Sequence, residues 1–140
     1  MEKISFDSGI RQFQLNGKGI LRFNPSDPNL YERFTQAGEK ILDIEKNLLK
    51  NAGEERPLKL LAQADREMKK LLSWVFGAEN DFDQLLEGVN VLAVAANGQQ
   101  VITNLLAALE PVIAEGVKNY VNLQVREAKE KADLRREALK

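Results

Sequence analysis

Apolar and polar residues alternate with the period of a β-strand in the first part of the chain. Residues 9–15 show this alternation, and residues 20–23 form a second run of the same kind. Asn16-Gly17, a dipeptide typical of tight hairpin turns, separates the two runs. A lone hairpin is only marginally stable in water, so we expect it to pack on helices or to pair with another chain. Ile4 and Phe6 either extend the first strand or form another one.

The pattern changes to a helical period after this hairpin. Asp27 is a suitable N-cap, and Pro28 fits the first position of a helix. The apolar residues that follow recur at helical spacing: Leu30, Tyr31, Phe34, Ala37, Ile41, Ile44 and Leu48. We expect this helix to end near Asn51-Ala52-Gly53. A polar linker at residues 54–57 follows, with Pro57 opening the next helix.

A second helix is predicted from about Leu58 to Val75, ending at Phe76-Gly77. Its apolar stripe is Leu61, Ala64, Met68, Leu71, Leu72 and Val75. The other side, which we expect to face solvent, carries Lys59, Asp65, Arg66, Glu67, Lys69 and Lys70. Asn80-Asp81 then caps a short helix that runs through Phe82, Leu85 and Leu86.

The rest of the chain is also predicted to be helical. The run Val89–Ala96 favours a helix because it holds three alanines. From residue 101 to 125, apolar residues recur at i, i+3 and i+4, and Pro111 either kinks or splits this helix. Residues 126–140 form a charged helical tail with ion pairs at i, i+4, which is frayed or docked on a partner.

These elements predict an α+β fold, mainly α, with an N-terminal β-hairpin followed by four or five helices. Residues 1–125 form the single domain, with the hairpin in 1–24 and the helical part in 28–125, and residues 126–140 are the tail. A chain of 140 residues is long enough for one core and little more.

The composition removes several classes of chemistry. The chain has neither Cys nor His, which excludes disulfides, thiol nucleophiles, histidine bases and zinc sites that need these residues. Its net charge is −1, without the basic excess typical of nucleic-acid binding. Residues 76–116 contain six acidic and no basic residues, which indicates either an apolar core segment or a surface for self-association. We expect no cofactor, no metal and no catalytic residue.

No targeting or membrane segment is expected. The first residues lack an apolar run behind a basic start, and no stretch reaches the ~18–20 apolar residues of a membrane span. We therefore expect an intracellular protein that does not enter a membrane.

Four local features have both a chemical and a structural interpretation. Residues 16–19 (Asn-Gly-Lys-Gly) lack the spacing of a phosphate-binding loop and favour a hairpin turn. Asp81 and Asp83 with Glu79 favour a helix start over a cation site. Trp74 favours the edge of a core over a binding aromatic, and the basic turn of residues 66–70 favours a solvated face.

The order of segments resembles the tail assembly chaperones of long-tailed phages and prophages of Gram-positive bacteria. Asp27-Pro28, Tyr31 and Phe34 at the entry to the first long helix carry the likeness, together with Phe76-Gly77 at the end of the second. The likeness covers roughly residues 20 to 120. In relatives the Phe-Gly is often followed by a glycine-rich spacer and another Phe-Gly. Here the spacer is Ala-Glu-Asn-Asp, and Phe82 is followed by Asp83.

This resemblance implies a non-catalytic role in the host cell cytoplasm. Such a chaperone binds and solubilises the tape measure protein, helps to recruit tail tube subunits and is absent from the finished particle. Many genes of this family also yield a longer product by ribosomal frameshifting. We further expect a homo-oligomer. The alternatives are a structural tail or head-completion subunit, a helical adaptor unrelated to phage, and an enzyme that uses carboxylates or a metal.

Candidate partner contacts are apolar residues late in the chain. They are Val112, Ile113, Val117, Tyr120 and Val121. Each of them fits an apolar surface for a helical partner and also fits the core of the domain. The helical periodicity favours the core.

Overall fold

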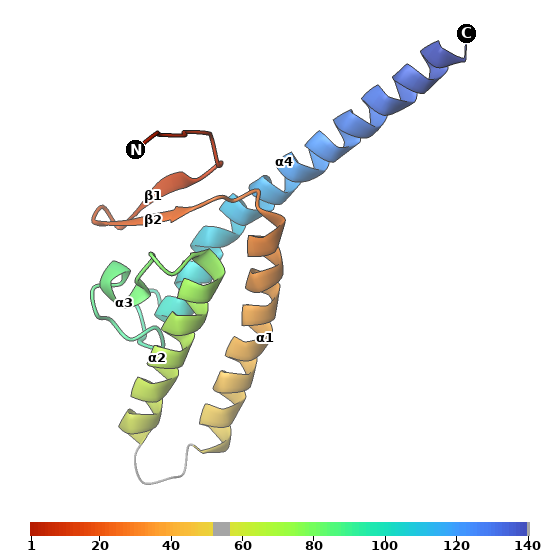
Figure 1. The fold of residues 1–140 in the computed structure, drawn as a ribbon. Helices are drawn as coiled ribbons and strands as arrows, with labels where there is room; N and C mark the ends of the chain where they lie inside the picture. Colours follow the sequence, from red (N-terminus) through yellow and green to blue (C-terminus); the bar gives the residue numbers. More distant parts are fainter. Residues whose placement is uncertain (52–56, 140) are drawn as a thin grey trace.

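The computed structural model describes residues 1–51 and 57–139 of the chain. Two strands, β1 (Arg11–Leu15) and β2 (Gly19–Phe23), are followed by α1 (Pro28–Lys50), α2 (Pro57–Phe76), α3 (Phe82–Leu85) and α4 (Val101–Ala138). In Figure 1, α1 and α2 lie side by side as an antiparallel pair, and one end of α4 packs across them while the other end projects away. The expected fold, an N-terminal hairpin followed by helices, is confirmed.

The hairpin forms as the sequence predicts. β1 and β2 pair antiparallel, with Leu15 opposite Gly19, and Asn16 and Gly17 take positive φ values of 51° and 74° in the turn. Both residue types adopt this left-handed region at low cost. The hairpin packs on helices, because Leu21 and Phe23 of β2 are buried. Ile4 and Phe6 belong to neither strand; residues 1–8 form an exposed arm outside the sheet.

The predicted helix ends are largely confirmed. The Asp27 side chain accepts a hydrogen bond from the Asn29 N–H, Pro28 opens α1, and Asn51 is its C-cap. The predicted stop at residues 52–53 and the linker at 54–56 lie outside the described residues, and Pro57 opens α2. Asp81 caps α3, accepting from the N–H groups of Asp83 and Gln84.

An aromatic cluster ties the hairpin to the helices. The Phe76 ring lies 4.9 Å from Phe23, 5.7 Å from Phe82 and 6.5 Å from Phe34, centroid to centroid. These rings come from α2, β2, α3 and α1, so four elements meet at one point. Rings at these distances add about 0.5–1.5 kcal/mol per pair beyond the area they bury.

The helix predicted for Val89–Ala96 is wrong. This segment forms turns, with an isolated bridge between Val94 and Gln100. Its main chain is bonded to other elements: the Val91 carbonyl accepts from the Ile102 N–H at 2.7 Å, and the Ala93 carbonyl accepts from the Val101 N–H at 2.9 Å. These carbonyls cap the start of α4, which has no side-chain N-cap bond. Alanine propensity is a weak preference, and these tertiary bonds override it.

The last helix is continuous, and its charged end projects from the body. A single helix spans Val101–Ala138 with Pro111 inside it, so the predicted split does not occur. Residues 118–139 are all exposed, and the charged tail is helical up to Ala138; its docking on a partner stays a prediction. Its recorded ion pair, Asp133 with Arg136 at 3.8 Å, is spaced i, i+3 rather than i, i+4. The described residues contain no helix long and apolar enough to cross a membrane.

Candidate functional site

The five predicted contact residues divide between the core and the surface. Ile113 is buried, and Val112 and Val117 are half-buried against the core. Tyr120 and Val121 are 38% and 50% exposed. The burial of Ile113 fits the core interpretation, whereas Tyr120 and Val121 remain free to contact a partner.

An open groove lies between α1 and α4, next to these residues. Its volume is about 530 Å³. The α1 wall is formed by Tyr31, Phe34, Thr35 and Gly38, and the α4 wall by Leu106, Glu110, Ile113, Ala114 and Val117. Of the five predicted contact residues, only Ile113 and Val117 line the groove. The sequence pattern places Tyr31 and Phe34 on the apolar stripe of the first long helix and does not reveal that they form the facing wall.

The groove is separate from a depression of about 710 Å³ beside α2 and α3. The small residues Gly38 and Ala114 stand on opposite walls of the groove and keep it open. Glu110 is the one ionisable carboxylate among the lining residues. An apolar groove between two helices is the geometry in which proteins commonly bind an amphipathic helix.

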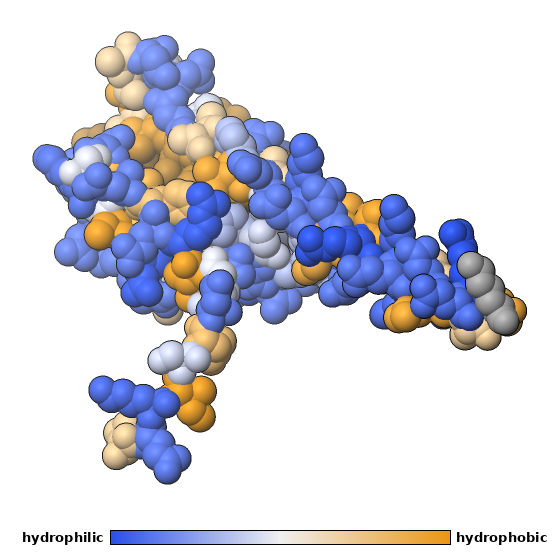
Figure 2. Space-filling view, turned by 90° about the horizontal axis from the view of Figure 1, so that it is seen from above, coloured by the Kyte–Doolittle hydropathy of each residue, from blue (hydrophilic) through white to orange (hydrophobic). Residues whose placement is uncertain are grey.

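The exposed half of α4 extends the apolar surface beyond the groove. Val121, Val125, Ala128 and Ala132 follow Val117 at spacings of three and four residues, so they share one side of the helix. Val121 and Val125 are 50% and 63% exposed. Figure 2 shows hydrophobic side chains among hydrophilic ones along this projecting end. The groove wall and the stripe (Val117, Val121, Val125, Ala128 and Ala132) therefore form one continuous apolar side of α4.

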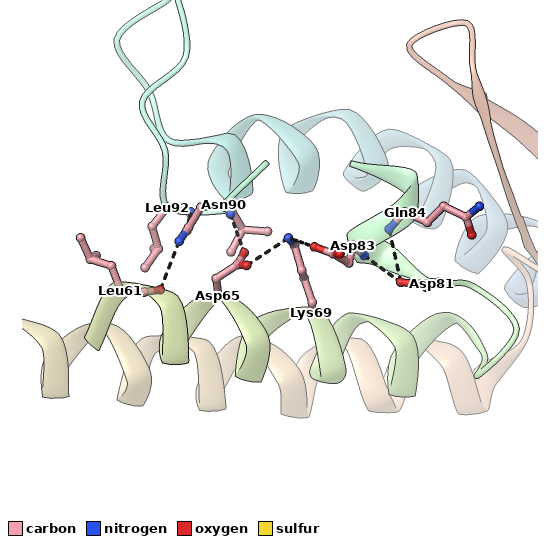
Figure 3. Close-up of polar contacts among 9 residues, drawn as sticks. Leu61, Asp65, Lys69, Asp81, Asp83, Gln84, Asn90 and Leu92 are labelled. Atoms are coloured by element: carbon pink, nitrogen blue, oxygen red, sulfur yellow. Dashed lines mark hydrogen bonds and ion pairs between the residues drawn. The ribbon is translucent and has the colours of Figure 1, made fainter. Parts of the chain in front are cut away.

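The depression beside α2 and α3 contains the best-formed charged cluster, which Figure 3 shows. The Lys69 Nζ lies 3.0 Å from a carboxylate oxygen of Asp65 and 2.6 Å from one of Asp83. Asp65 also accepts a hydrogen bond from the Val91 N–H at 2.8 Å. The prediction that Lys69 lies on a solvated face is wrong, because only 6% of this residue is exposed. Lys69 faces Asp83 of α3, a contact that the sequence pattern of α2 alone does not reveal.

The surroundings of Lys69 keep its ammonium group charged. Burial lowers the pKa of Lys69, but hydrogen bonds to Asp83 and Asp65 and the charges of both carboxylates outweigh this, and the net pKa is raised. A lysine that acts as a base or nucleophile needs a lowered pKa. The cluster is therefore suited to joining α2, α3 and the loop around residue 91, and not to amine chemistry.

The remaining sequence candidates have structural partners. Asp81 caps α3 and Asp83 binds Lys69, and within the described residues no group of three acidic side chains is placed to hold a metal ion. Residues 16–19 form the hairpin turn and the start of β2. Trp74 is 44% exposed, with the Lys40 Nζ 4.9 Å from its ring centroid, so it lies outside the buried core.

Comparisons with protein-family models, with curated proteins and with solved structures find no match to this chain.

Proposed function

We propose that this chain is a non-catalytic tail assembly chaperone that binds apolar helical segments of a tape measure protein and keeps them soluble. The observation that carries the proposal is the continuous apolar side of α4, which runs from the groove onto a helix with no partner among the described residues. The resemblance of residues 20 to 120 to that family supplies the partner class.

The amount of exposed surface supports a binding role. The chain exposes 10504 Å². A compact monomer of 15.8 kDa is expected to expose about 7,300 Å². The difference, roughly 3,000 Å², is of the size that stable protein complexes bury. Much of this surface belongs to the projecting end of α4, which contributes no buried residue after Gly116.

A helical client suits this surface physically. A tape measure protein presents long apolar stripes before the tail tube encloses it, and each groove offers only a short contact. Several chaperone molecules bound along one client would sum many weak contacts into strong overall binding. Because every contact is weak, the bound chaperones would also be released when tube subunits compete for the same stripe.

The test begins at the genomic locus, where a very long helical protein encoded downstream is the expected client. Co-expression of the full chain with that protein is expected to move the client from the insoluble to the soluble fraction, measured by quantitative gel analysis after centrifugation. A locus without such a protein, or a client whose solubility does not change, contradicts the proposal. Detection of the chain in purified particles by mass spectrometry would favour a structural tail subunit instead.

A charge-matched pair of variants locates the contact. Val121→Asp with Val125→Asp places two carboxylates on the apolar stripe, and we expect it to abolish solubilisation of the client. Asn119→Asp with Asn122→Asp adds the same charge to the same exposed helix at positions outside the stripe, and we expect it to have less effect. All four positions are exposed, so the circular dichroism spectrum should remain helical in both variants. Equal loss of solubilisation in both variants would contradict a role for the stripe.

A further inference from the structure

The N-terminal residues form an exposed arm with an apolar side. Residues 1–8 are all exposed, and the side chains of Ile4 and Phe6 are 89% and 80% exposed. In an extended chain, residues two apart point to the same side, so Ile4 and Phe6 share one face of the arm. Figures 1 and 2 show this arm standing away from the body of the molecule.

The base of the arm is fixed by specific contacts. Gly9 has a φ of +77°, and a Cβ there would lie 2.5 Å from the Asn24 Nδ2. The same Nδ2 donates a hydrogen bond to the Ser8 carbonyl at 3.1 Å. Because Asn24 directly follows β2, these contacts hold residue 8 beside the end of β2.

The sheet has one closed edge and one open edge. The Asn80 side chain closes the outer edge of β2: its Oδ1 accepts from the Arg22 N–H at 3.0 Å, and its Nδ2 donates to the Arg22 carbonyl at 2.8 Å. Arg22 therefore directs its main-chain groups away from β1. Its register partner Gln12 directs its own N–H and carbonyl outward from β1, and by alternation so does Gln14.

We propose that the arm of a second copy of this chain adds as a further strand to the open edge of β1. Phe13 and Leu15, on the apolar face of β1, are only half-buried, whereas Leu21 and Phe23 of β2 are fully covered. A strand added beside β1 with Ile4 and Phe6 on that face would cover the exposed sides of Phe13 and Leu15. Its main chain would bind the outward groups of Gln12 and Gln14.

Charge and surface area favour a second copy as the occupant. Residues 9–24 contain three basic residues, Arg11, Lys18 and Arg22, and no acidic residue. The arm carries Glu2 and Asp7, which can pair with these bases, besides Lys3 and the amino group of Met1. Reciprocal exchange of two arms would cover two β1 edges in one dimer and remove part of the excess exposed surface. This proposal concerns the chain with itself and does not depend on the identity of any client.

The first test measures the mass of the purified full chain by sedimentation velocity over a hundredfold range of concentration. We expect a concentration-dependent dimer, and a chain that stays monomeric throughout overturns the proposal. Phe6→Asp should weaken dimerisation at least tenfold, whereas Ser5→Asp, with the same charge on the other face of the arm, should weaken it much less. Gln12→Pro removes an outward N–H from an edge strand, where the fixed φ of proline is tolerated, so it should also weaken the dimer. Dimerisation unaffected by Phe6→Asp and Gln12→Pro overturns the proposal.

Cysteine cross-linking identifies the partner strand, because the chain has no cysteine of its own. Ser5→Cys and Gln12→Cys are made in separate chains with tags of different size, mixed and oxidised. We expect a disulfide between the two different chains. A double variant that forms the bond only within one chain would show that the arm folds onto its own β1, which overturns the exchange. Binding of a client protein is read separately, so failure of either proposal leaves the other testable.

Discussion

Single residues with no apparent chemistry decide how the parts of this molecule fit together. Asn80 is an example: its side chain is buried and hydrogen-bonds both main-chain groups of Arg22 and the Phe76 carbonyl. A buried amide with all these partners is far less costly than one without them. One polar side chain therefore joins the hairpin to the end of α2, and it does so at the edge where another strand would otherwise pair.

Two glycines in helices should respond in opposite ways to the same substitution. A Cβ at Gly116 would lie 2.0 Å from the Pro25 carbonyl oxygen, whereas one at Gly38 meets no atom within 4 Å. Gly116→Ala should therefore lower the free energy of unfolding by about 2 kcal/mol or more, because main chain must move. Gly38→Ala should raise it by about 0.5–1 kcal/mol through helix propensity. Urea unfolding measures the free energy of unfolding of both variants. A change of the same sign in the two variants would contradict the close packing of α4 on Pro25.

Lys69 should make stability depend on alkaline pH. Its pKa is higher in the folded chain than the ordinary value of 10.5, so folding favours the protonated form. This contribution is complete below about pH 10.5 and is lost as the pH rises through the folded-state pKa. Lys69→Met should cost about 2–3 kcal/mol at pH 8, because the mostly buried Asp65 loses its counter-charge, and less at pH 11.

Unfolding by urea at pH 8 and at pH 11 measures this dependence. Lys70→Met is the control, since Lys70 is the exposed neighbour on the same helix. A cost for Lys69→Met that is the same at both pH values, or no larger than that for Lys70→Met, would argue against the ion pairs as the cause.

At the scale of the element, α4 shows that a helix can continue through a proline. Pro111 has no N–H, so the Ala107 carbonyl lacks its partner four residues on. Both residues are exposed, and water can bind that carbonyl. Four apolar residues of the same helix are buried in the core, and their packing offsets the cost of the missing hydrogen bond. They are Ile102, Leu105, Leu109 and Ile113.

Pro111→Ala should stabilise the fold. The restored hydrogen bond and better helix propensity favour the folded chain by about 1–2 kcal/mol, less than the ~3 kcal/mol propensity difference because alanine also frees the unfolded chain. The melting temperature should rise by several degrees, measured by circular dichroism at 222 nm. A fall in melting temperature would indicate that the packing of α4 needs the proline.

At the scale of the whole molecule, the body and the projecting helix are energetically separate. No residue after Gly116 is buried, and residues 118–139 are exposed throughout. The apolar side chains there gain little from folding of the isolated chain. They are instead available to a client or to another copy, and this is why the proposed function is placed on this end of the molecule.

A chain that ends at Val125 should fold as the full chain does. Because residues 126–139 are all exposed, its melting temperature should stay within about 2 °C of the full chain, while its hydrodynamic radius falls. Differential scanning calorimetry and size-exclusion chromatography with light scattering measure the two quantities. A large loss of melting temperature would mean that the tail stabilises the body, and would contradict a domain boundary near residue 125.

The sequence determined the elements whose causes are local. Asp27 and Pro28 start α1, Asn16-Gly17 turns the hairpin, and Asp81 caps α3, because each acts through its own or adjacent backbone groups. The run Val89–Ala96 and the environment of Lys69 needed the tertiary structure, since their partners are distant in the chain. The same holds for the groove, whose α1 wall lies about 70 residues from its α4 wall. A local pattern can name the apolar side of a helix, but only packing decides which part of that side is covered and which part remains exposed.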